Sequence, residues 1–188
     1  MAIQLQKKQP VSLAKEMPGL QGFVAGLGWD PAVVNGFTVD LDLSLFMLGA
    51  NGKLIADEFL VFYNNMESPD GSTTYPGDSR GGEGVGDDEI IKVDLSKIDA
   101  RVEFLCFTVT IDQSEERGHR FSHVKNSYIN IRNAADNSIL CQYELDESFT
   151  NEDSLVFAAV SRNNGDWDVE ALGQAFTGGL STLVELYQ

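Results

Sequence analysis

The chain has 188 residues, of which 43% are hydrophobic and 10% aromatic, which is enough apolar mass for one domain with a packed core. Its 13 basic and 29 acidic side chains leave a formal net charge of −16. That charge argues against a nucleic-acid-binding surface and against electrostatic binding to anionic lipid, and it suits cations or basic partners instead.

Short runs of strand-like periodicity, separated by turn signals, follow one another along the chain. In the clearest run, 38–48, apolar and polar residues alternate as they do in a half-buried strand. Strands are predicted over 23–29, 38–48, 59–64, 90–95, 102–111, 128–132, 139–145, 155–161 and 167–172. The turn sequences at 133–137 and 163–166 predict hairpins, and helical signals are confined to 114–125 and 180–187. The pattern predicts an all-β fold, a two-sheet β-sandwich with short helical turns, as a single domain over 1–188.

Targeting and redox signals are sparse. Residues 1–10 lack the apolar stretch of a secretory signal, and the longest apolar run, 43–48, is too short to span a membrane. Cys106 and Cys141 lie far apart within predicted strands and form no C-x-x-C motif, which argues against a disulfide framework or a cysteine-rich zinc site. We therefore expect a cytoplasmic protein with no direct membrane insertion.

The segment from Asn64 to Glu89 has no apolar periodicity and is expected to form a long loop. Loops of this length are uncommon in compact domains unless they are functional or disordered. It contains six glycines and a single basic residue, Arg80. Its acidic residues are Glu67, Asp70, Asp78, Glu83, Asp87, Asp88 and Glu89.

Crowded carboxylates repel one another unless solvent or a cation neutralises them. Calcium takes six to eight oxygen ligands, and glycines allow backbone carbonyls to turn toward an ion. Asp40 and Asp42, two apart on one strand, are predicted to face the same acidic pocket, and Asn64 and Asn65 supply neutral oxygens. A solvated, flexible acidic loop would have the same composition, so both interpretations stay open at this point.

Three other motifs are weaker. The sequence 77–81, Gly-Asp-Ser-Arg-Gly, satisfies the nucleophile-elbow pattern around Ser79, but it lacks a preceding strand and a following helix. His119 and His123 have the i, i+4 spacing of half a metal site, but their charged neighbours favour surface histidines of a solvated turn. Residues 40–45 depart from the EF-hand pattern after the second aspartate.

Short motifs follow one another along nearly the whole chain. They are Gly-Leu-Gly-Trp-Asp at 26–30, Asp-Leu-Asp-Leu-Ser at 40–44, Phe-Tyr-Asn-Asn at 62–65, Ser-Pro-Asp-Gly-Ser at 68–72, Gly-Asp at 77–78, Gly-Glu-Gly at 82–84, Gly-Asp-Asp-Glu at 86–89, Val-Thr-Ile at 109–111, Phe-Ser-His-Val at 121–124, Gly-Asp-Trp at 165–167, Gly-Gln at 173–174 and Gly-Gly-Leu at 178–180. With these motifs the chain resembles the TerD family of tellurium-resistance and stress-response proteins. The segment from Ser68 to Glu89 carries the most specific part of this resemblance. Gly81 and Val85 depart from the residues that the family favours there.

The resemblance implies a β-sandwich that binds Ca²⁺, with two ions expected, in a long acidic metal-binding loop. It implies partners among other Ter-type stress proteins, some of them membrane-bound, so that the protein would lie at the inner face of the membrane through those partners. It implies no established catalytic reaction. The metal ligands carried over by position are Asp40, Asp42, Asn64, Asn65, Asp70, Gly71, Asp78, Glu83, Gly84, Asp87, Asp88 and Glu89.

The expected function is that of a calcium-binding module in a tellurite-resistance or stress-response system, acting through protein partners rather than catalysis. Tellurite is an anion, which carboxylates repel unless bound cations reverse the local charge. Reduction would need a reactive cysteine pair, which Cys106 and Cys141 do not resemble. The alternatives are a metal-dependent hydrolase that uses the acidic loop and a purely structural acidic domain.

Overall fold

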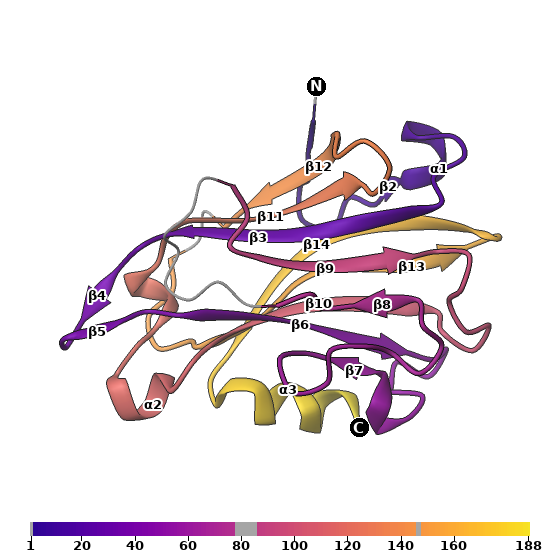
Figure 1. Ribbon diagram of the computed structural model, residues 1–188. Helices are drawn as coiled ribbons and strands as arrows, with labels where there is room; N and C mark the ends of the chain where they lie inside the picture. Colours follow the sequence, from indigo (N-terminus) through magenta and orange to yellow (C-terminus); the bar gives the residue numbers. More distant parts are fainter. Residues whose placement is uncertain (1, 78–85, 146–147) are drawn as a thin grey trace.

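Two six-stranded sheets pack face to face in the computed structural model, which describes residues 2–77, 86–145 and 148–188 (Figure 1). The first sheet has the order β1 (Ile3–Gln4), β12 (Ile139–Glu144), β11 (Lys125–Asn133), β3 (Gly22–Asp30), β9 (Glu89–Asp94), β8 (Thr73–Thr74). The second has the order β2 (Val11–Ser12), β14 (Asp166–Phe176), β13 (Ser154–Asn163), β10 (Phe104–Ile111), β6 (Leu41–Leu48), β7 (Leu60–Val61). The predicted all-β sandwich is confirmed.

The remaining elements are small. A hairpin of β4 (Val33–Val34) and β5 (Phe37–Thr38) projects from one end of the sandwich (Figure 1). The helices are α1 (Leu13–Glu16), α2 (Ser114–Arg117) and α3 (Gly179–Tyr187), with 3₁₀ turns η1 (Asp57–Phe59) and η2 (Phe121–His123). No helix among the described residues is long and apolar enough to cross a bilayer.

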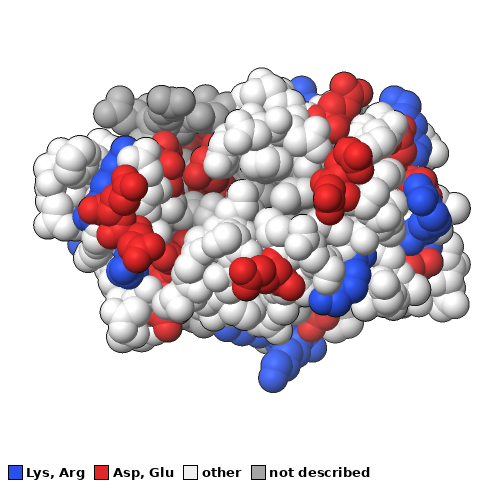
Figure 2. All heavy atoms as spheres, turned by 90° about the horizontal axis from the view of Figure 1, so that it is seen from below, with Lys and Arg blue, Asp and Glu red and all other residues white. Residues whose placement is uncertain are grey.

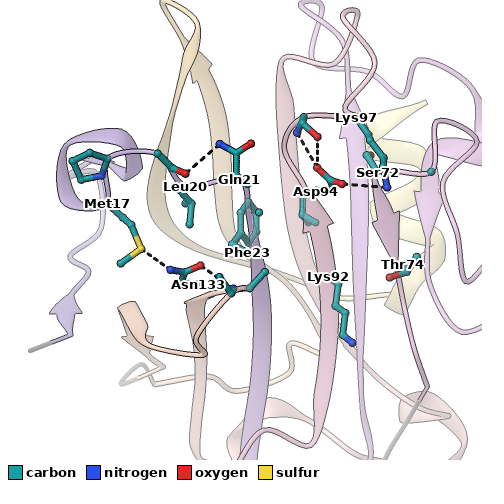
Figure 3. A pocket seen from close by; sticks show the side chains of 18 residues that line it. Met17, Leu20, Gln21, Phe23, Ser72, Thr74, Lys92, Asp94, Lys97 and Asn133 are labelled. Carbon is teal, nitrogen blue, oxygen red and sulfur yellow. Dashed lines mark hydrogen bonds and ion pairs between the residues drawn. The ribbon is translucent and has the colours of Figure 1, made fainter.

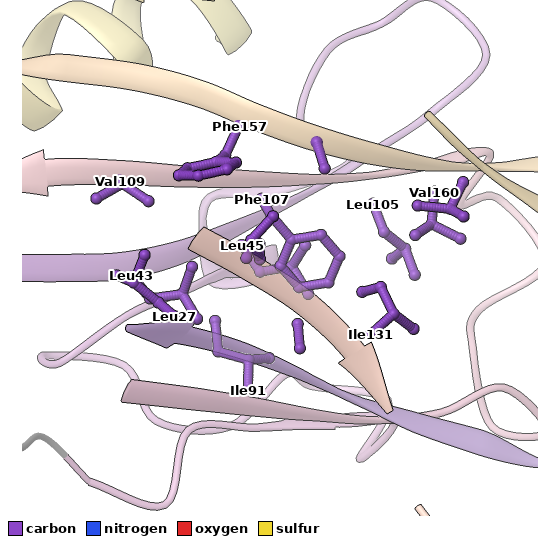
Figure 4. Packing of buried hydrophobic residues seen from close by; sticks show 14 of the residues in the cluster. Leu27, Leu43, Leu45, Ile91, Leu105, Phe107, Val109, Ile131, Phe157 and Val160 are labelled. Atoms are coloured by element: carbon purple, nitrogen blue, oxygen red, sulfur yellow. The ribbon is translucent and has the colours of Figure 1, made fainter. Parts of the chain in front are cut away.

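The main core lies between the two sheets and follows from strand alternation. On β6 and β10, every second side chain faces the first sheet, including Leu43, Leu45 and Phe107 (Figure 4). Leu27 on β3 and Ile91 on β9 meet them from the other side (Figure 4). Because the two inner faces supply the apolar layer, the polar residues of these strands are directed to the outer faces.

A second, smaller core lies on the outer face of the second sheet, beneath α3. Phe46 and Leu48 of β6 pack with Leu183 of α3, and the rings of Phe46 and Tyr187 are 4.9 Å apart. The end of β6 is therefore buried on both faces, which explains why its sequence stops alternating after Ser44.

The hairpins and the C-terminal helix were correctly predicted. β11 and β12 pair across the turn at 133–137, and β13 and β14 pair across 163–166. Asn164 and Gly165 have φ values of 52° and 91°, which is the left-handed pair that a tight hairpin requires. The helical prediction over 180–187 corresponds to α3, and the prediction over 114–125 to α2 and η2.

The prediction of an unstructured loop from Asn64 to Glu89 is wrong for the part around β8. Thr73 and Thr74 pair with Val93 and Lys92 of β9 and extend the first sheet. Ser72 and Thr73 are buried there, and hydrogen bonds that involve their own or neighbouring side chains satisfy their polar groups. Because these buried residues are polar, the apolar periodicity of the sequence did not reveal the strand. The strand prediction over 59–64 is also too long, since only Leu60–Val61 is a strand.

The N-terminal segment carries elements that the sequence did not predict. β1 pairs in parallel with β12, β2 pairs with β14, and α1 follows directly. Strands of two residues are too short to show a period of two, so only their partners in the fold define them.

Both cysteines are free and buried, on different sheets. Burial raises the pKa of Cys106 to about 11 and that of Cys141 to about 12. Both are therefore protonated thiols at neutral pH and lack the thiolate character of reactive cysteines.

Candidate metal centre

The three consecutive acidic residues at the start of β9, Asp87, Asp88 and Glu89, point in three different directions. They lie where β3, β9 and β11 meet at one end of the first sheet. Their separate surroundings determine which of their oxygens remain available to a cation.

Glu89 is buried between the sheets, with 2% of its surface exposed. One carboxylate oxygen accepts a hydrogen bond from the Tyr75 hydroxyl at 2.5 Å, and the other accepts one from the backbone N–H of Leu43. The Leu43 N–H belongs to the stretch of β6 that extends beyond the short strand β7. Glu89 thus takes the place of a missing strand partner and ties the first sheet to the edge of the second.

Asp87 lies on the outer face of the first sheet, directly over Gly26. A Cβ atom at position 26 would be 2.0 Å from its Oδ2, so only glycine leaves room for this carboxylate. Asn130 donates to Oδ1 at 2.6 Å, and Arg132 forms an ion pair with Oδ2. Burial, followed by the nearby Asp87 charge, raises the pKa of Tyr128 to about 12. This carboxylate already has a cationic partner within the fold.

Asp88 is the least satisfied of the three. Its Oδ2 accepts a hydrogen bond from the Trp29 backbone N–H at 3.2 Å, just where the β3–β9 ladder ends. Its Oδ1 is buried and has no hydrogen-bond partner among the described residues. Burial raises the pKa of Asp88, the Trp29 hydrogen bond opposes that shift, and the neighbouring Asp87 adds to it. A buried oxygen of this kind is costly unless a donor or a cation reaches it.

Asp88 borders a polar hollow of about 840 Å³ at this end of the sheet. The charged side chains that line the hollow with Asp88 are Asp30, Glu144 and Lys125. Negative charge therefore predominates around the unpartnered oxygen, which favours a cation over an anion there.

Asp40 and Asp42 belong to the second sheet rather than to the surroundings of Asp88. Asp42 lines a hollow of about 340 Å³ together with Tyr63 and Asp112. Burial and the Asp42 and Asp112 charges raise the pKa of Tyr63. Asp40 precedes β6, and its carbonyl oxygen accepts the Asp112 N–H at 2.9 Å. The contact of Glu89 with Leu43 joins β9 to β6 one residue beyond Asp42.

Asp70 is located at the far end of β9. Its Oδ1 accepts hydrogen bonds from Ser68 Oγ (2.6 Å) and Ser72 N (2.9 Å), and its Oδ2 accepts one from Asp99 N (2.8 Å). These bonds outweigh partial burial and lower its pKa. Gly71 follows with a φ of 66°, which supports the tight turn.

The distance between the two ends of β9 decides whether Asp70 and Gly71 can bind the same ion as Asp87, Asp88 and Glu89. The Ser72 carbonyl accepts the Asp94 N–H, so Asp70 lies beside the Asp94 end of β9. From Glu89 to Asp94 the strand runs roughly 17 Å, at about 3.3 Å per residue. Ligands of one calcium ion lie within roughly 5 Å of each other, since each is about 2.4 Å from the metal. Asp70 and Gly71 are therefore not brought together with Asp87, Asp88 and Glu89.

Asn64 and Asn65 were also predicted as metal ligands. Asn64 is exposed, and the Asn65 side chain donates to the carbonyls of Glu58 and Leu60 at 2.9 and 2.7 Å. The candidates Asp78, Glu83 and Gly84, and the hydrolase candidate Ser79, lie outside the described residues. Within residues 2–77, 86–145 and 148–188, no group of three or more His, Cys, Asp or Glu side chains is arranged to hold a metal.

The histidine pair is not arranged as a metal site. His119 is fully buried, with Nε2 at 3.2 Å from the Val34 carbonyl oxygen, and His123 Nδ1 accepts the Arg120 N–H at 3.1 Å. The interpretation of both as surface histidines is wrong for His119. Its contact with Val34 connects the loop after α2 to the β4–β5 hairpin.

Sequence reasoning missed the polar residues of β11 and a capping aspartate. Tyr128, Asn130 and Arg132 alternate within a predicted strand and meet Asp87 on its outer face. Asp153 is buried and accepts hydrogen bonds from Gly178 N and Gly179 N at 2.9 and 3.0 Å, capping α3. The alternation in β11 could be seen in the sequence, but nothing in the sequence showed that these residues meet Asp87, which precedes β9.

Acidic side chains gather toward the left end of the face in Figure 2, which is the end of α2 and the β4–β5 hairpin in Figure 1. Basic side chains are interspersed among them there. The charge of this end is thus predominantly, though not uniformly, negative.

Comparison with known proteins assigns the family. The TerD domain family matches residues 1–187. The chain is 38% identical over 187 residues to "Tellurium resistance protein TerD" of Serratia marcescens, which covers all of this chain and 97% of that protein. It is 42% identical over 188 residues to "Uncharacterized protein YceE" and 39% identical over 188 residues to "General stress protein 16U", both of Bacillus subtilis (strain 168), at coverages of 100% of this chain and 98% and 97% of those proteins.

Solved structures share the fold. The crystal structure of a homologue of telluride resistance protein (TerD) from Streptomyces coelicolor A3(2) superposes with a TM-score of 0.72 at 21% identity, over 90% of this chain and 99% of that one. The chain belongs to the TerD domain family, whose relatives include proteins named for tellurium resistance and for general stress.

Proposed function

We propose that this chain is a calcium-binding module of a tellurium-resistance and stress-response system, cytoplasmic and acting through protein partners. The family relationship supports the system, and the acidic end of the sandwich supports the ion. The proposal assigns no catalytic reaction to the chain.

One observation carries the calcium proposal: the Oδ1 of Asp88 is buried and has no hydrogen-bond partner within residues 2–77, 86–145 and 148–188. Burial has raised the pKa of this carboxyl, so the fold bears the cost of keeping it charged without supplying a donor for that oxygen. A hard cation removes this cost because it bonds directly to carboxylate oxygen.

The proposed ligand set is narrower than the sequence alone suggested. Asp88 is retained for one ion, and Asp40 and Asp42, which lie near Asp112 on the second sheet, for the other, together with Asp78 and Glu83 on the family resemblance. Asp87 shares its charge with Arg132, and both Glu89 oxygens already accept hydrogen bonds, so these two are proposed to position the segment. Asp70 and Gly71 are left out because they lie at the other end of β9.

The test is calcium titration of chelator-treated protein by calorimetry, with a melting curve at each step. A ligand that binds only the folded state stabilises it by about 2.7 kcal/mol at a hundredfold excess over Kd, so calcium should raise Tm by several degrees. Mg²⁺ should raise it less, because it demands a smaller octahedral shell.

Matched variants locate the ion. Asp88→Asn should weaken calcium binding without destabilising the ion-free protein, because a neutral amide costs less to bury than an unpaired carboxylate. Asp166→Asn, an equal change of charge in the exposed β13–β14 hairpin, should bind calcium as the unmodified chain does. An unchanged melting curve after chelation and calcium re-addition would refute the proposal.

Calcium is further proposed to control association with other Ter-type proteins. Two ions would change the formal net charge from −16 to −12 at one end of the sandwich, which reduces repulsion of an acidic partner. Pull-down of such partners should therefore increase with calcium, decrease with chelator and stay low for Asp88→Asn. Equal capture in all three conditions would mean that the ion stabilises the fold but does not control association.

A further inference from the structure

A hollow of about 610 Å³ opens on the first sheet at the end opposite Asp88 (Figure 3). One wall is the turn after α1, with Met17 and Leu20, and the other is formed by β9 and β8, with Lys92 and Thr74 (Figure 3). Its size is in the range of small-molecule sites. Of the predicted ligand set only Gly71 lines it, and the proposed calcium function does not use it.

The hollow is built into the fold. Gly22 lines it, and a Cβ atom there would be 2.6 Å from the Val93 carbonyl oxygen, so glycine is what allows the backbones of β3 and β9 to approach closely at this point. Backbone hydrogen bonds join its walls: Leu95 N to Gln21 O (2.9 Å), Asp94 N to Ser72 O (2.7 Å) and Ala134 N to Gly22 O (3.2 Å). The walls are therefore held in place before any ligand arrives.

The charge of this hollow is opposite to that of the molecule. Two lysines, Lys92 and Lys97, and one aspartate, Asp94, line it, a formal charge of +1. Three other hollows, lined by described residues, have formal charges of −2, −2 and −5 by the same count. On a chain of net charge −16, this is a localised site for an anion.

The aspartate in the hollow is already neutralised. Asp94 accepts hydrogen bonds from Ser96 N (3.0 Å) and Ser96 Oγ (2.6 Å), and Lys97 Nζ lies 3.1 Å from its Oδ2. The Lys92 ammonium group has no ion pair or hydrogen bond within the described parts of the chain. Lys92 stands opposite Thr74 in the β8–β9 register, so an ammonium group and a hydroxyl are presented together.

The facing wall is apolar. Met17 and Leu20 are partly exposed, and Asn133 Nδ2 donates to the Met17 sulfur at 2.9 Å, which orients that side chain (Figure 3). Methionine adapts its shape to an apolar ligand more readily than a branched side chain does. A ligand that fits both walls has an anionic head and an apolar body.

We infer that this hollow binds a small organic carboxylate, with its head at Lys92 and Thr74 and its apolar chain against Met17 and Leu20. Its occupancy does not depend on calcium, because it lies at the other end of β9. The proposal therefore stands or falls separately from the metal site.

The experiment is an NMR titration of the full-length ¹⁵N-labelled chain with hexanoate, and in parallel with hexanol and hexylamine. These probes share the apolar chain and differ only in the head group. Hexanoate should shift the amide resonances of Gly19, Gly22, Thr74 and Ala134. Hexanol and hexylamine should bind with at least tenfold lower affinity, as measured by titration of the same resonances. Equal titration by hexanol, or no shifts with hexanoate, would overturn the proposal.

Matched lysine variants test the head-group contact. Lys92→Gln should weaken hexanoate binding about tenfold or more, since it removes a charge-assisted hydrogen bond. Lys125→Gln, an exposed lysine on β11 outside this hollow, makes the same change in net charge and should leave the affinity as it was. Equal affinities for the two variants would show that hexanoate responds only to net charge and would refute the site.

Discussion

The two ends of β9 treat carboxylates in opposite ways. At the Asp94 end, Asp94 and the nearby Asp70 each accept several hydrogen bonds, and the pKa of each is lowered mainly by those bonds. At the other end, burial raises the pKa of Asp88, and one of its oxygens has no partner in the part of the chain that the structure describes. Aspartates that look alike in the sequence are thus structural in one place and available to a cation in the other. The number of donors that the fold supplies decides between the two roles.

The largest effect is expected from Glu89→Ala, at the start of β9. It removes the acceptor to which the Tyr75 hydroxyl and the Leu43 N–H both donate in the interior, and the loss of each buried hydrogen bond costs about 1–3 kcal/mol. The free energy of unfolding should therefore drop by about 2–5 kcal/mol in urea titration.

Tyr75→Phe is the control for Glu89→Ala, because it removes one donor and leaves the Leu43 contact in place. It should cost clearly less than Glu89→Ala. A loss equal to that of Glu89→Ala would mean that the Leu43 contact adds no stability.

Gly26→Ala should destabilise the chain by about 1–3 kcal/mol, the usual range for overpacking. The added methyl group takes the position of the Asp87 carboxylate, 2.0 Å away, and forces it off Asn130 and Arg132. The cost should largely vanish in an Asp87→Ala background, which a double-mutant cycle measures. A full cost in that background would place the clash elsewhere than at Asp87.

Asp70→Asn should cost about 1–2 kcal/mol at neutral pH, because hydrogen bonds to a charged acceptor are the stronger ones. The pKa of Asp70 is lower in the folded chain than in the unfolded one. It therefore contributes stability above the unfolded value of about 3.9, and this is lost as the pH falls through the folded value.

Urea unfolding between pH 7 and pH 3 checks the Asp70 prediction. The acid-induced loss of stability should be smaller in Asp70→Asn than in the unmodified chain, and calcium affinity should be unaltered. A large loss of calcium affinity in this variant would return Asp70 to the metal site and contradict the contrast between the two ends of β9.

Periodicity and turn chemistry were sufficient for the architecture. The alternation over 38–48 predicted β6, and the Asn164–Gly165 pair predicted the β13–β14 hairpin, because both signals depend on local backbone geometry. Composition likewise indicated a single β-rich domain. The two-residue strands β1, β2 and β8 were not predicted, because they are too short to show a period of two and because the strands that pair with them are distant in sequence.

The residue types of the candidate site could be predicted from the sequence, but their arrangement could not, for a physical reason. The sequence by itself determined that carboxylates and glycines crowd into 64–89, since composition is local. Only the tertiary structure decided where each one points: Asp87 to Arg132, Asp88 to the Trp29 N–H, Glu89 to Leu43 and Asp70 to Asp99. These partners lie 29 to 59 residues away in the chain, so the burial and hydrogen bonding of each carboxylate exist only once the strands of the first sheet have paired and, for Glu89, once the two sheets have packed.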